Sequence, residues 1–219
     1  MFGRIKTKDT AKARQLEFYF PTFPELWTLA VIVGRHQILI DRSIMTTENY
    51  FLTDLAAVKS LLYDKCDYKL NNFSRDTESS QYSACSFQLN ELFFVHRASK
   101  ITPTKAGQFV TIWKRSENGI TTPYDISDNI DWFIITSRSG DKLGQFVFPK
   151  MVLADKGVIS INGKGGKRGI RVYPQWSIPP NKQAEETQRW QQNYFCSINQ
   201  IDLPNHAFIK RLFDKSNIN

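Results

Sequence analysis

The sequence predicts an α+β fold in which one mixed β-sheet at the centre is flanked by helices. Short apolar runs separated by turn residues dominate the middle of the chain, from Tyr82 to Tyr173. Apolar residues at helical spacing lie on both sides of that region, near residues 46–62 and 182–195. With 219 residues, 41% of them hydrophobic, the chain is long enough to enclose one core and to carry an appendage.

The N-terminal part differs from the rest. Residues 1–44 begin with several Lys and Arg, continue with the aromatic and proline cluster 18–24, and show no clear periodicity. Met45 and the polar residues after it precede a helical pattern that runs from Phe51 to Leu62. We therefore expect residues 1–44 to be an accessory segment, which includes the possibility that Met45 is the true start, and residues 45–219 to form the main domain.

The central region predicts a series of strands joined by short turns. Asn90 and Glu91 are expected to join the first two strands as a hairpin, whereas the polar stretch 67–80 is expected to be a loop. Later helices are expected at 150–156, ended by Gly157, at 182–195, capped by Asn181, and around 208–213. The expected strands are 82–89, 92–99, 108–114, 132–136, 143–148 and 170–173.

The charge balance favours an anionic partner. The chain has 29 Lys and Arg against 21 Asp and Glu, a net charge of +8. This indicates nucleic acid first and an anionic membrane second, with simple surface solvation as the alternative. The apolar run 26–33 is too short to span a bilayer and has no cleavage site after it, so we expect neither membrane insertion nor export.

The cysteines and histidines are scattered along the chain. No CxxC pattern occurs, and no histidine stands at zinc-ligand spacing from a cysteine. We expect reduced thiols, a cytoplasmic protein, and neither a histidine-ligated metal site nor a Cys–His dyad. The residues concerned are Cys66, Cys85, Cys196, His36, His96 and His206.

Two basic regions are candidates for phosphate binding. The glycine-rich loop 163–169 can expose backbone N–H groups and adds cationic side chains, although it is not a P-loop; solvated lysines on a flexible connection are the alternative. The stretch 96–115 contains five cations and no carboxylate. The candidate phosphate ligands are Arg97, Lys100, Lys105, Lys114, Arg115, Lys150, Lys164, Lys167, Arg168 and Arg171.

Aromatic, amide and acidic residues give further candidates, each with a structural alternative. Trp113 and Trp176 could stack on bases or pack in the core. Gln108 and Gln145 occur in two GQF motifs and could bind a ligand or satisfy buried polar groups. The loop carboxylates could bind a divalent cation or serve as caps and turn formers; they are Asp125, Asp128 and Asp131.

Four motifs in register resemble the MepB family, small bacterial proteins named from an operon with a multidrug efflux pump. The motifs are ITPTKAGQFVTIWKR, GQFVFPK, GKRGIRVYPQW and NKQAEETQRWQQNYF. The resemblance runs from about Thr46 to Phe195 and leaves residues 1–44 outside. The family carries no established activity over to this chain.

The resemblance further implies a core similar to type II restriction endonucleases, the PD-(D/E)XK superfamily. A nuclease of that kind would use Asp125 or Asp131 as first acid, Glu78 as second and Gln145 on the neighbouring strand, with Mg²⁺ as cofactor. Val147 stands where the lysine belongs, and Lys150 lies five positions after Gln145.

We therefore expect a protein that binds nucleic acid or a nucleotide, DNA before RNA, without catalysis and without a cofactor. A Mg²⁺-dependent nuclease and a cytoplasmic, partner-binding regulatory protein are the alternatives. The sequence gives no oligomeric state.

Overall fold

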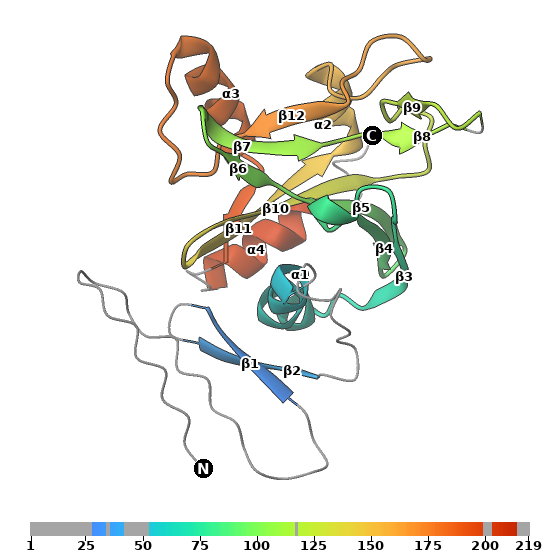
Figure 1. Cartoon of the computed structure of the whole chain (residues 1–219). Coiled ribbons are helices and arrows are strands. Elements are labelled where there is room, and N and C mark those ends of the chain that lie inside the picture. Colours follow the sequence, from blue (N-terminus) through green and yellow to red (C-terminus); the bar gives the residue numbers. More distant parts are fainter. Residues whose placement is uncertain (1–27, 34–35, 42–52, 117, 199–202, 214–219) are drawn as a thin grey trace, which may run out of the picture.

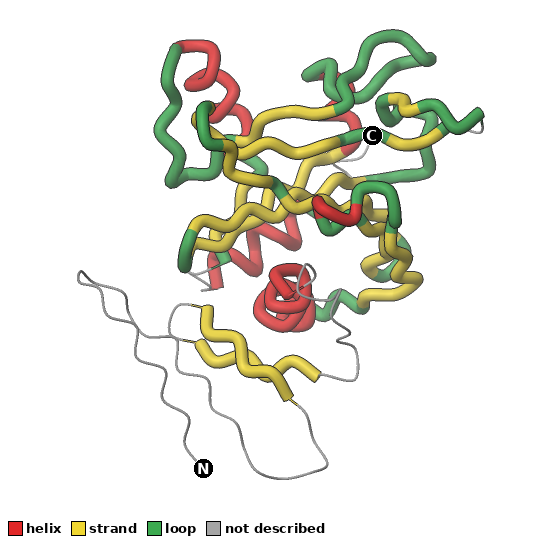
Figure 2. The backbone as a smooth tube through the Cα atoms, in the orientation of Figure 1, coloured by secondary structure: helices red, strands yellow, loops and turns green. Residues whose placement is uncertain are grey.

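A computed structural model describes residues 28–33, 36–41, 53–116, 118–198 and 203–213. It has α+β architecture, with a mixed six-stranded sheet at the centre and few helices (Figures 1 and 2). The predicted class is confirmed. Within the described ranges, no helix has the length and apolar character needed to cross a bilayer.

The six-stranded sheet has the order β13-β11-β10-β5-β4-β3. Neighbours are antiparallel except β5 and β10, which are parallel. The hairpin expected at Asn90 and Glu91 is confirmed as β4–β5, and β10 and β11 form a second hairpin. The strands are β3 (Leu70–Arg75), β4 (Cys85–Leu89), β5 (Leu92–Ala98), β10 (Trp132–Ser139), β11 (Lys142–Pro149) and β13 (Phe195–Ser197).

The basic strand belongs to a second sheet, so the prediction of a single sheet is wrong. The N–H of Ser99 bonds to the carbonyl oxygen of Thr136 in β10, and the chain then leaves the large sheet and forms a three-stranded sheet with the order β12-β7-β6. Two hairpins complete the strands. These strands are β6 (Lys100–Thr102), β7 (Lys105–Thr111), β12 (Gly169–Val172), β8 (Lys114–Arg115), β9 (Thr121–Thr122), β1 (Thr28–Val33) and β2 (His36–Asp41).

The helices lie where the apolar spacing predicts them. The first is α1 (Thr53–Val58), continued by the wider turn η3 (Lys59–Tyr63) and the tight turn η4 (Asp64–Cys66); its expected beginning lies outside the described residues. The side-chain oxygen of Asn181 accepts the N–H of Ala184 at 2.9 Å and caps α3. The other helices are η5 (Ser80–Tyr82), α2 (Lys150–Asp155), α3 (Lys182–Gln192) and α4 (Leu203–Leu212).

Two expectations about edge strands fail. The stretch 67–80 was expected to be a loop but contains β3, and the helix expected to reach Phe195 ends at Gln192, before β13. Both are edge strands. β13 is held by backbone bonds to β11, which is distant in sequence, whereas β3 pairs with β4, the next strand along the chain. β3 is almost fully exposed, so it lacks the alternation of buried residues from which a strand is recognised.

Hydrophobic cores lie on both faces of the large sheet. One contains Leu62, Trp132 and Phe213, between the sheet and the helices α1 and α4. The other includes Phe146 and Val110 and joins the large sheet to the three-stranded sheet. All three cysteines are buried, and none of them forms a disulfide.

Candidate functional site

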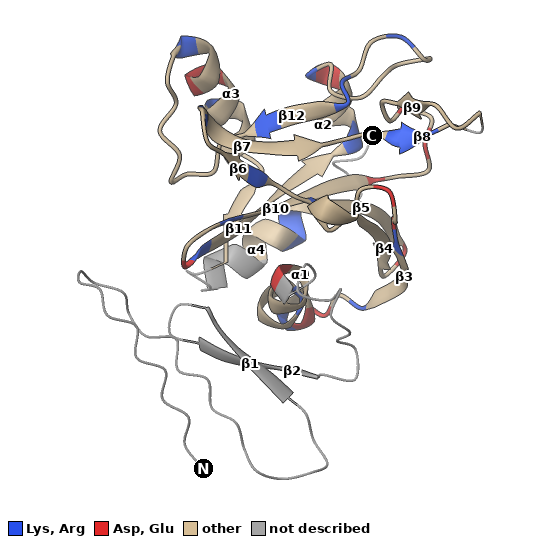
Figure 3. Ribbon diagram, viewed as in Figure 1, with Lys and Arg blue, Asp and Glu red and all other residues tan. Residues whose placement is uncertain are grey.

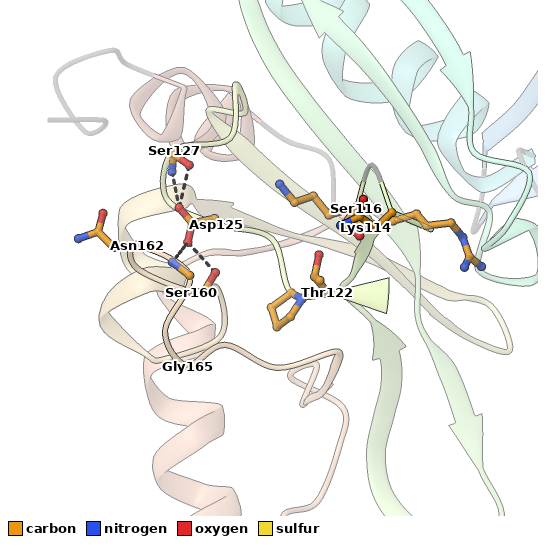
Figure 4. Close-up of a pocket in the computed structure, with 12 residues that line it drawn as sticks. Lys114, Ser116, Thr122, Asp125, Ser127, Ser160, Asn162 and Gly165 are labelled. Atoms are coloured by element: carbon orange, nitrogen blue, oxygen red, sulfur yellow. Dashed lines mark hydrogen bonds between the residues drawn. The ribbon is translucent and has the colours of Figure 1, made fainter. Parts of the chain in front are cut away.

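A hollow of about 660 Å³ lies between the β8–β9 hairpin, the acidic loop after β9, and the glycine-rich loop. Asp125, Ser127 and Ser160 lie on one side of it, and Lys114, Ser116 and Thr122 on the other (Figure 4). Its lining residues are Lys114, Arg115, Ser116, Asn118, Thr122, Pro123, Asp125, Ser127, Ser160, Asn162, Gly163 and Gly165.

Asp125 holds two walls of the hollow together. Its Oδ2 accepts hydrogen bonds from Ser160 Oγ at 2.7 Å and from the Gly163 N–H at 2.8 Å. Its Oδ1 accepts from the Ser127 N–H at 3.0 Å and from Ser127 Oγ at 2.8 Å. These donors, the Gly163 N–H foremost, hold the pKa of the Asp125 carboxyl well below its usual range. A carboxylate with four donors acts here as a turn former, which was the alternative to metal binding.

The glycine-rich loop has one well-defined backbone shape. Asn162, Gly163, Gly165 and Gly166 all have positive φ, and Gly166 (φ +81) has no room for a side chain, since a Cβ would stand 2.6 Å from Pro123 Cβ. The N–H groups of Gly163, Lys164 and Lys167 bond to Asp125, Ile161 and Val158. The loop therefore offers a ligand fewer backbone donors than its sequence indicated.

The side chains of this loop remain available. Lys164 and Lys167 are exposed, and neither has an acidic partner in the part of the chain that the structure describes. Arg168 is also exposed and donates to Thr121 Oγ1 at 3.2 Å, which links the loop to β9. The loop that carries these three cations lines the hollow through Asn162, Gly163 and Gly165.

Lys114 and Arg115 bring positive charge from β8 (Figure 3), and each is paired with a carboxylate. Lys114 pairs with Asp128, whose other oxygen accepts the Asp125 N–H at 2.8 Å. Arg115 Nε lies 2.5 Å from the Glu78 carboxylate, and Arg115 Nη1 donates to the carbonyl oxygen of Gly119 at 2.5 Å. Lys150, another candidate, donates to the Asp128 carbonyl oxygen at 2.9 Å.

Arg97 is not part of any exposed basic surface, because it is 3% exposed. Its Nη2 donates to Asp76 Oδ2 and to Tyr124 Oη, both at 3.0 Å. Asp76 Oδ1 in turn accepts the N–H of Glu78 at 3.1 Å. Arg97 therefore positions the turn that carries Glu78 and the loop that carries Asp125. No sequence pattern marked Asp76 for this role.

The remaining cations lie on the three-stranded sheet. Arg171 donates to the carbonyl oxygens of Lys105 and Ala106 at 3.3 and 3.2 Å, and so holds the turn between β6 and β7. Lys100 Nζ lies 4.7 Å from the centroid of the Tyr82 ring, and Lys105 is exposed. The ten predicted phosphate ligands are thus not one surface.

The two tryptophans differ in their surroundings. Trp176 packs against the second core, with its ring centroid 5.4 Å from that of Phe195. Trp176 therefore has the packing role that was the alternative to base stacking. Trp113 is partly exposed, and the Arg115 guanidinium lies 5.7 Å from its ring centroid. One face of Trp113 is therefore already covered by a cation.

The residues of the expected nuclease site do not converge. Glu78 pairs with Arg115, whereas Asp131 Oδ2 accepts the N–H of Phe93 at 2.8 Å. Asp131 precedes β10 by one residue, and Thr136, five residues further, is the strand partner of Gln145. Asp131 and Gln145 are therefore about 16 Å apart along the sheet, too far to share an ion. Nowhere in the described residues do three or more His, Cys, Asp or Glu gather as a metal site.

Both GQF glutamines are buried and satisfy polar groups. Gln145 accepts from Tyr63 Oη at 2.6 Å and donates to Thr136 Oγ1 at 2.9 Å. Gln108 accepts from Ser99 Oγ at 2.7 Å and donates to the Arg138 carbonyl oxygen at 3.1 Å. This is the structural alternative stated for them above.

Sequence reasoning missed most of the neutral groups of the hollow. Thr122, Ser127, Ser160 and Asn162 are small polar residues that fit no motif, and they converge because Asp125 folds two loops onto each other. The one available signal was their position beside glycine and proline, which marks them as loop residues.

Comparison with known proteins gives one family. The sequence model of the MepB-like family matches residues 76–197, the stretch that contains the whole hollow. A solved structure of MepB is 31% identical, superposes with a TM-score of 0.59, and is aligned over 72% of this chain and 100% of that one. None of the curated proteins matches the chain.

Proposed function

The chain belongs to the MepB-like family, and on this premise we propose that it binds nucleic acid or a nucleotide through phosphate, without catalysis. The hollow beside β8 is the proposed site, and DNA is the favoured partner. The observation that carries the proposal is the arrangement of Lys114 and Arg115 opposite a glycine-rich loop that bears further cations.

Charge and size both support an anionic ligand. Lys114 and Arg115 line the hollow, and the glycine-rich loop, whose Gly163 and Gly165 also line it, carries Lys164, Lys167 and Arg168. These five cations outnumber the carboxylates of Glu78, Asp125 and Asp128. The volume of about 660 Å³ suits a nucleotide-sized group. Hydroxyl and amide side chains in the lining can bond to sugar or phosphate oxygens.

We also propose that the large sheet is a degenerate form of the restriction-endonuclease core. The parallel pair β5–β10 next to the antiparallel hairpin β10–β11 supports this relationship. A sheet related to that core could still bind nucleic acid. It would not support Mg²⁺-dependent cleavage, because its carboxylates lie apart and Val147 occupies the position of the lysine.

Binding over a salt series tests the proposal. Fluorescence anisotropy would be measured with labelled duplex DNA, single-stranded DNA and RNA of one length, and with a labelled nucleotide. We expect affinity for the preferred nucleic acid to fall as salt rises, since bound cations release counterions. Replacing Lys164 and Lys167 together by Gln should reduce the slope of log affinity against log salt by about 1 to 2.

A matched control removes two exposed lysines away from the hollow. Lys142 lies at the turn between β10 and β11, and Lys182 begins α3. Replacing both by Gln should leave the slope nearly unchanged. Absence of binding at low salt, or an equal effect of both double variants, would contradict the proposal.

The two alternative functions make different predictions. Incubation with plasmid and RNA in Mg²⁺ or Mn²⁺ should give no cleavage, and cleavage that Asp131→Ala abolishes would instead support a nuclease. A protein partner whose capture survives high salt and nuclease treatment would favour a regulatory protein.

A further inference from the structure

We propose that Glu78 is an internal competitor for ligand phosphate at Arg115, so that Arg115 is the exchangeable anion-binding residue of the hollow. This inference rests on the proposed function and deepens it. Glu78 would then select against weakly charged anions.

The two ion pairs at the hollow differ in how firmly they are held. In the Lys114–Asp128 pair, the Asp128 side chain is 18% exposed and its carboxylate also accepts the Asp125 N–H. In the Arg115–Glu78 pair, the side chains are 46% and 38% exposed. Among the described residues, Arg115 is the one partner of the Glu78 carboxylate. The second pair can therefore open without breaking other bonds.

Arg115 keeps its position when Glu78 leaves. Its Nη1 remains bonded to the Gly119 carbonyl oxygen, and its guanidinium remains near the ring of Trp113. Its Nε, released from the Glu78 carboxylate, can then donate to a phosphate oxygen that takes the place of that carboxylate. A guanidinium fixed in this way can bind phosphate with two parallel N–H donors, a geometry that arginine favours.

Glu78 is presented to Arg115 by a rigid turn. Its N–H bonds to Asp76, and buried Arg97 fixes Asp76. An internal carboxylate held in this way competes at high effective concentration. A singly charged anion gains little binding free energy by replacing the Glu78 carboxylate, whereas a phosphate group with greater negative charge gains more. The competition therefore favours phosphate over singly charged anions.

The experiment compares Glu78→Gln with a charge-matched control. Glu186 is exposed on α3, which contributes no residue to the lining of the hollow, so Glu186→Gln makes the same change in net charge elsewhere. Affinity for a labelled single-stranded oligonucleotide and for inorganic phosphate would be measured at fixed salt. We expect Glu78→Gln to bind each about two- to five-fold more tightly, the range of an exposed ion pair.

A double variant assigns the gain to Arg115. In an Arg115→Gln background, Glu78→Gln should produce no further gain, because the competitor has no cation left to occupy. Thermal unfolding of each variant verifies that it is folded.

The outcomes separate this inference from the proposed function. If the wild-type protein binds with normal salt dependence but Glu78→Gln gains no more than Glu186→Gln, the competition is disproved and the binding function stands. A gain that persists without Arg115 also disproves it. If no form binds phosphate or nucleic acid, the proposed function fails, and this inference fails with it.

Discussion

At the scale of single residues, the hydrogen-bond partners of buried His96 determine its protonation state and tautomer. Its Nδ1 lies 2.9 Å from the Ser83 carbonyl oxygen, which can only accept, so Nδ1 carries the proton. Its Nε2, 2.9 Å from Thr136 Oγ1, must then accept from the Thr136 hydroxyl. Gln145 and Tyr63 continue the chain, each donating to the next member. Every member is satisfied while the imidazole is neutral.

The neutral imidazole predicts acid sensitivity. Burial lowers the pKa of His96 from 6.5 to about 4. Between pH 6.5 and 4, His96 is protonated in the unfolded chain but neutral in the folded chain. The contribution of neutral His96 to the free energy of unfolding is therefore fully present above pH 6.5 and is lost as pH falls towards 4. The loss is on the order of 3 kcal/mol. Urea unfolding at pH 7, 6, 5 and 4 measures it.

The His96→Gln variant is the comparison for this prediction. It should be less stable at pH 7 but should lose less stability between pH 6.5 and 4. Asp125 titrates outside that interval, because its pKa is lowered from 3.8. An undiminished pH dependence in the variant would refute the role of His96.

At the scale of elements, two neighbouring glycines of the glycine-rich loop allow the cost of backbone strain to be measured apart from the cost of a steric clash. Gly165 and Gly166 both have positive φ, +76 and +81. A Cβ at Gly165 would meet no atom within 4 Å, whereas at Gly166 it would stand 2.6 Å from Pro123 Cβ and 2.9 Å from Ser160 N. The two neighbours are therefore a matched pair.

We expect Gly165→Ala to cost about 1 kcal/mol, the cost of the left-handed conformation alone. Gly166→Ala should cost roughly 2 to 4 kcal/mol, because the loop must also move away from Pro123. Urea unfolding gives both values, and anisotropy shows whether phosphate binding weakens with Gly166→Ala. Equal costs at both positions would mean that the loop is not packed as described.

Elements with local signals were predictable, whereas their partners were not. The hairpin of β4 and β5 follows from alternating apolar residues on both sides of Asn90, which adopts positive φ in the turn. Exposed β3 carries no such alternation. Nor does any residue near Ser99 indicate that β6 and β7 form a different sheet, whose third strand, β12, pairs with β7 from far along the chain.

The candidate site was predictable in the same partial way. Lys114, Asp125 and the glycine-rich loop could be selected by residue type, and they do meet. The burial of Arg97 and the separation of Asp131 from Gln145 could not, because each depends on the three-dimensional course of the sheet.

At the scale of the whole molecule, the core extends beyond the residues that match the family. Leu55 and Leu62 precede residue 76, and Ile209 and Phe213 follow residue 197, yet all four are buried in the first core. The ring centroid of Phe213 lies 5.0 Å from that of Phe94 and 5.7 Å from that of Trp132. The helices α1 and α4 therefore belong to the folded unit.

Two truncations test this boundary. A chain that ends at Ile198 should lose cooperative unfolding, because the apolar side chains of α4 and Phe213 no longer cover the sheet. A chain that begins at Met45 should keep it if residues 1–44 are accessory. Circular dichroism during thermal unfolding distinguishes the two, and the opposite pattern would show that the boundary is wrong.

The parallel pairing of β5 with β10 has a consequence for how the binding region can vary. Ala98 and Thr136 are register partners, and the chain between β5 and β10 contains the strands β6 to β9, Lys114, Arg115 and Asp125. Most of the hollow is thus a single insertion anchored at both ends to adjacent strands. The crossover leaves β5 at Ala98 and enters β10 at Trp132, whose register partner is Phe94, so its anchor points lie roughly 14 Å apart. Insertions and deletions in the crossover leave this distance and the sheet register intact. Divergence in ligand choice is therefore expected to accumulate in this one crossover.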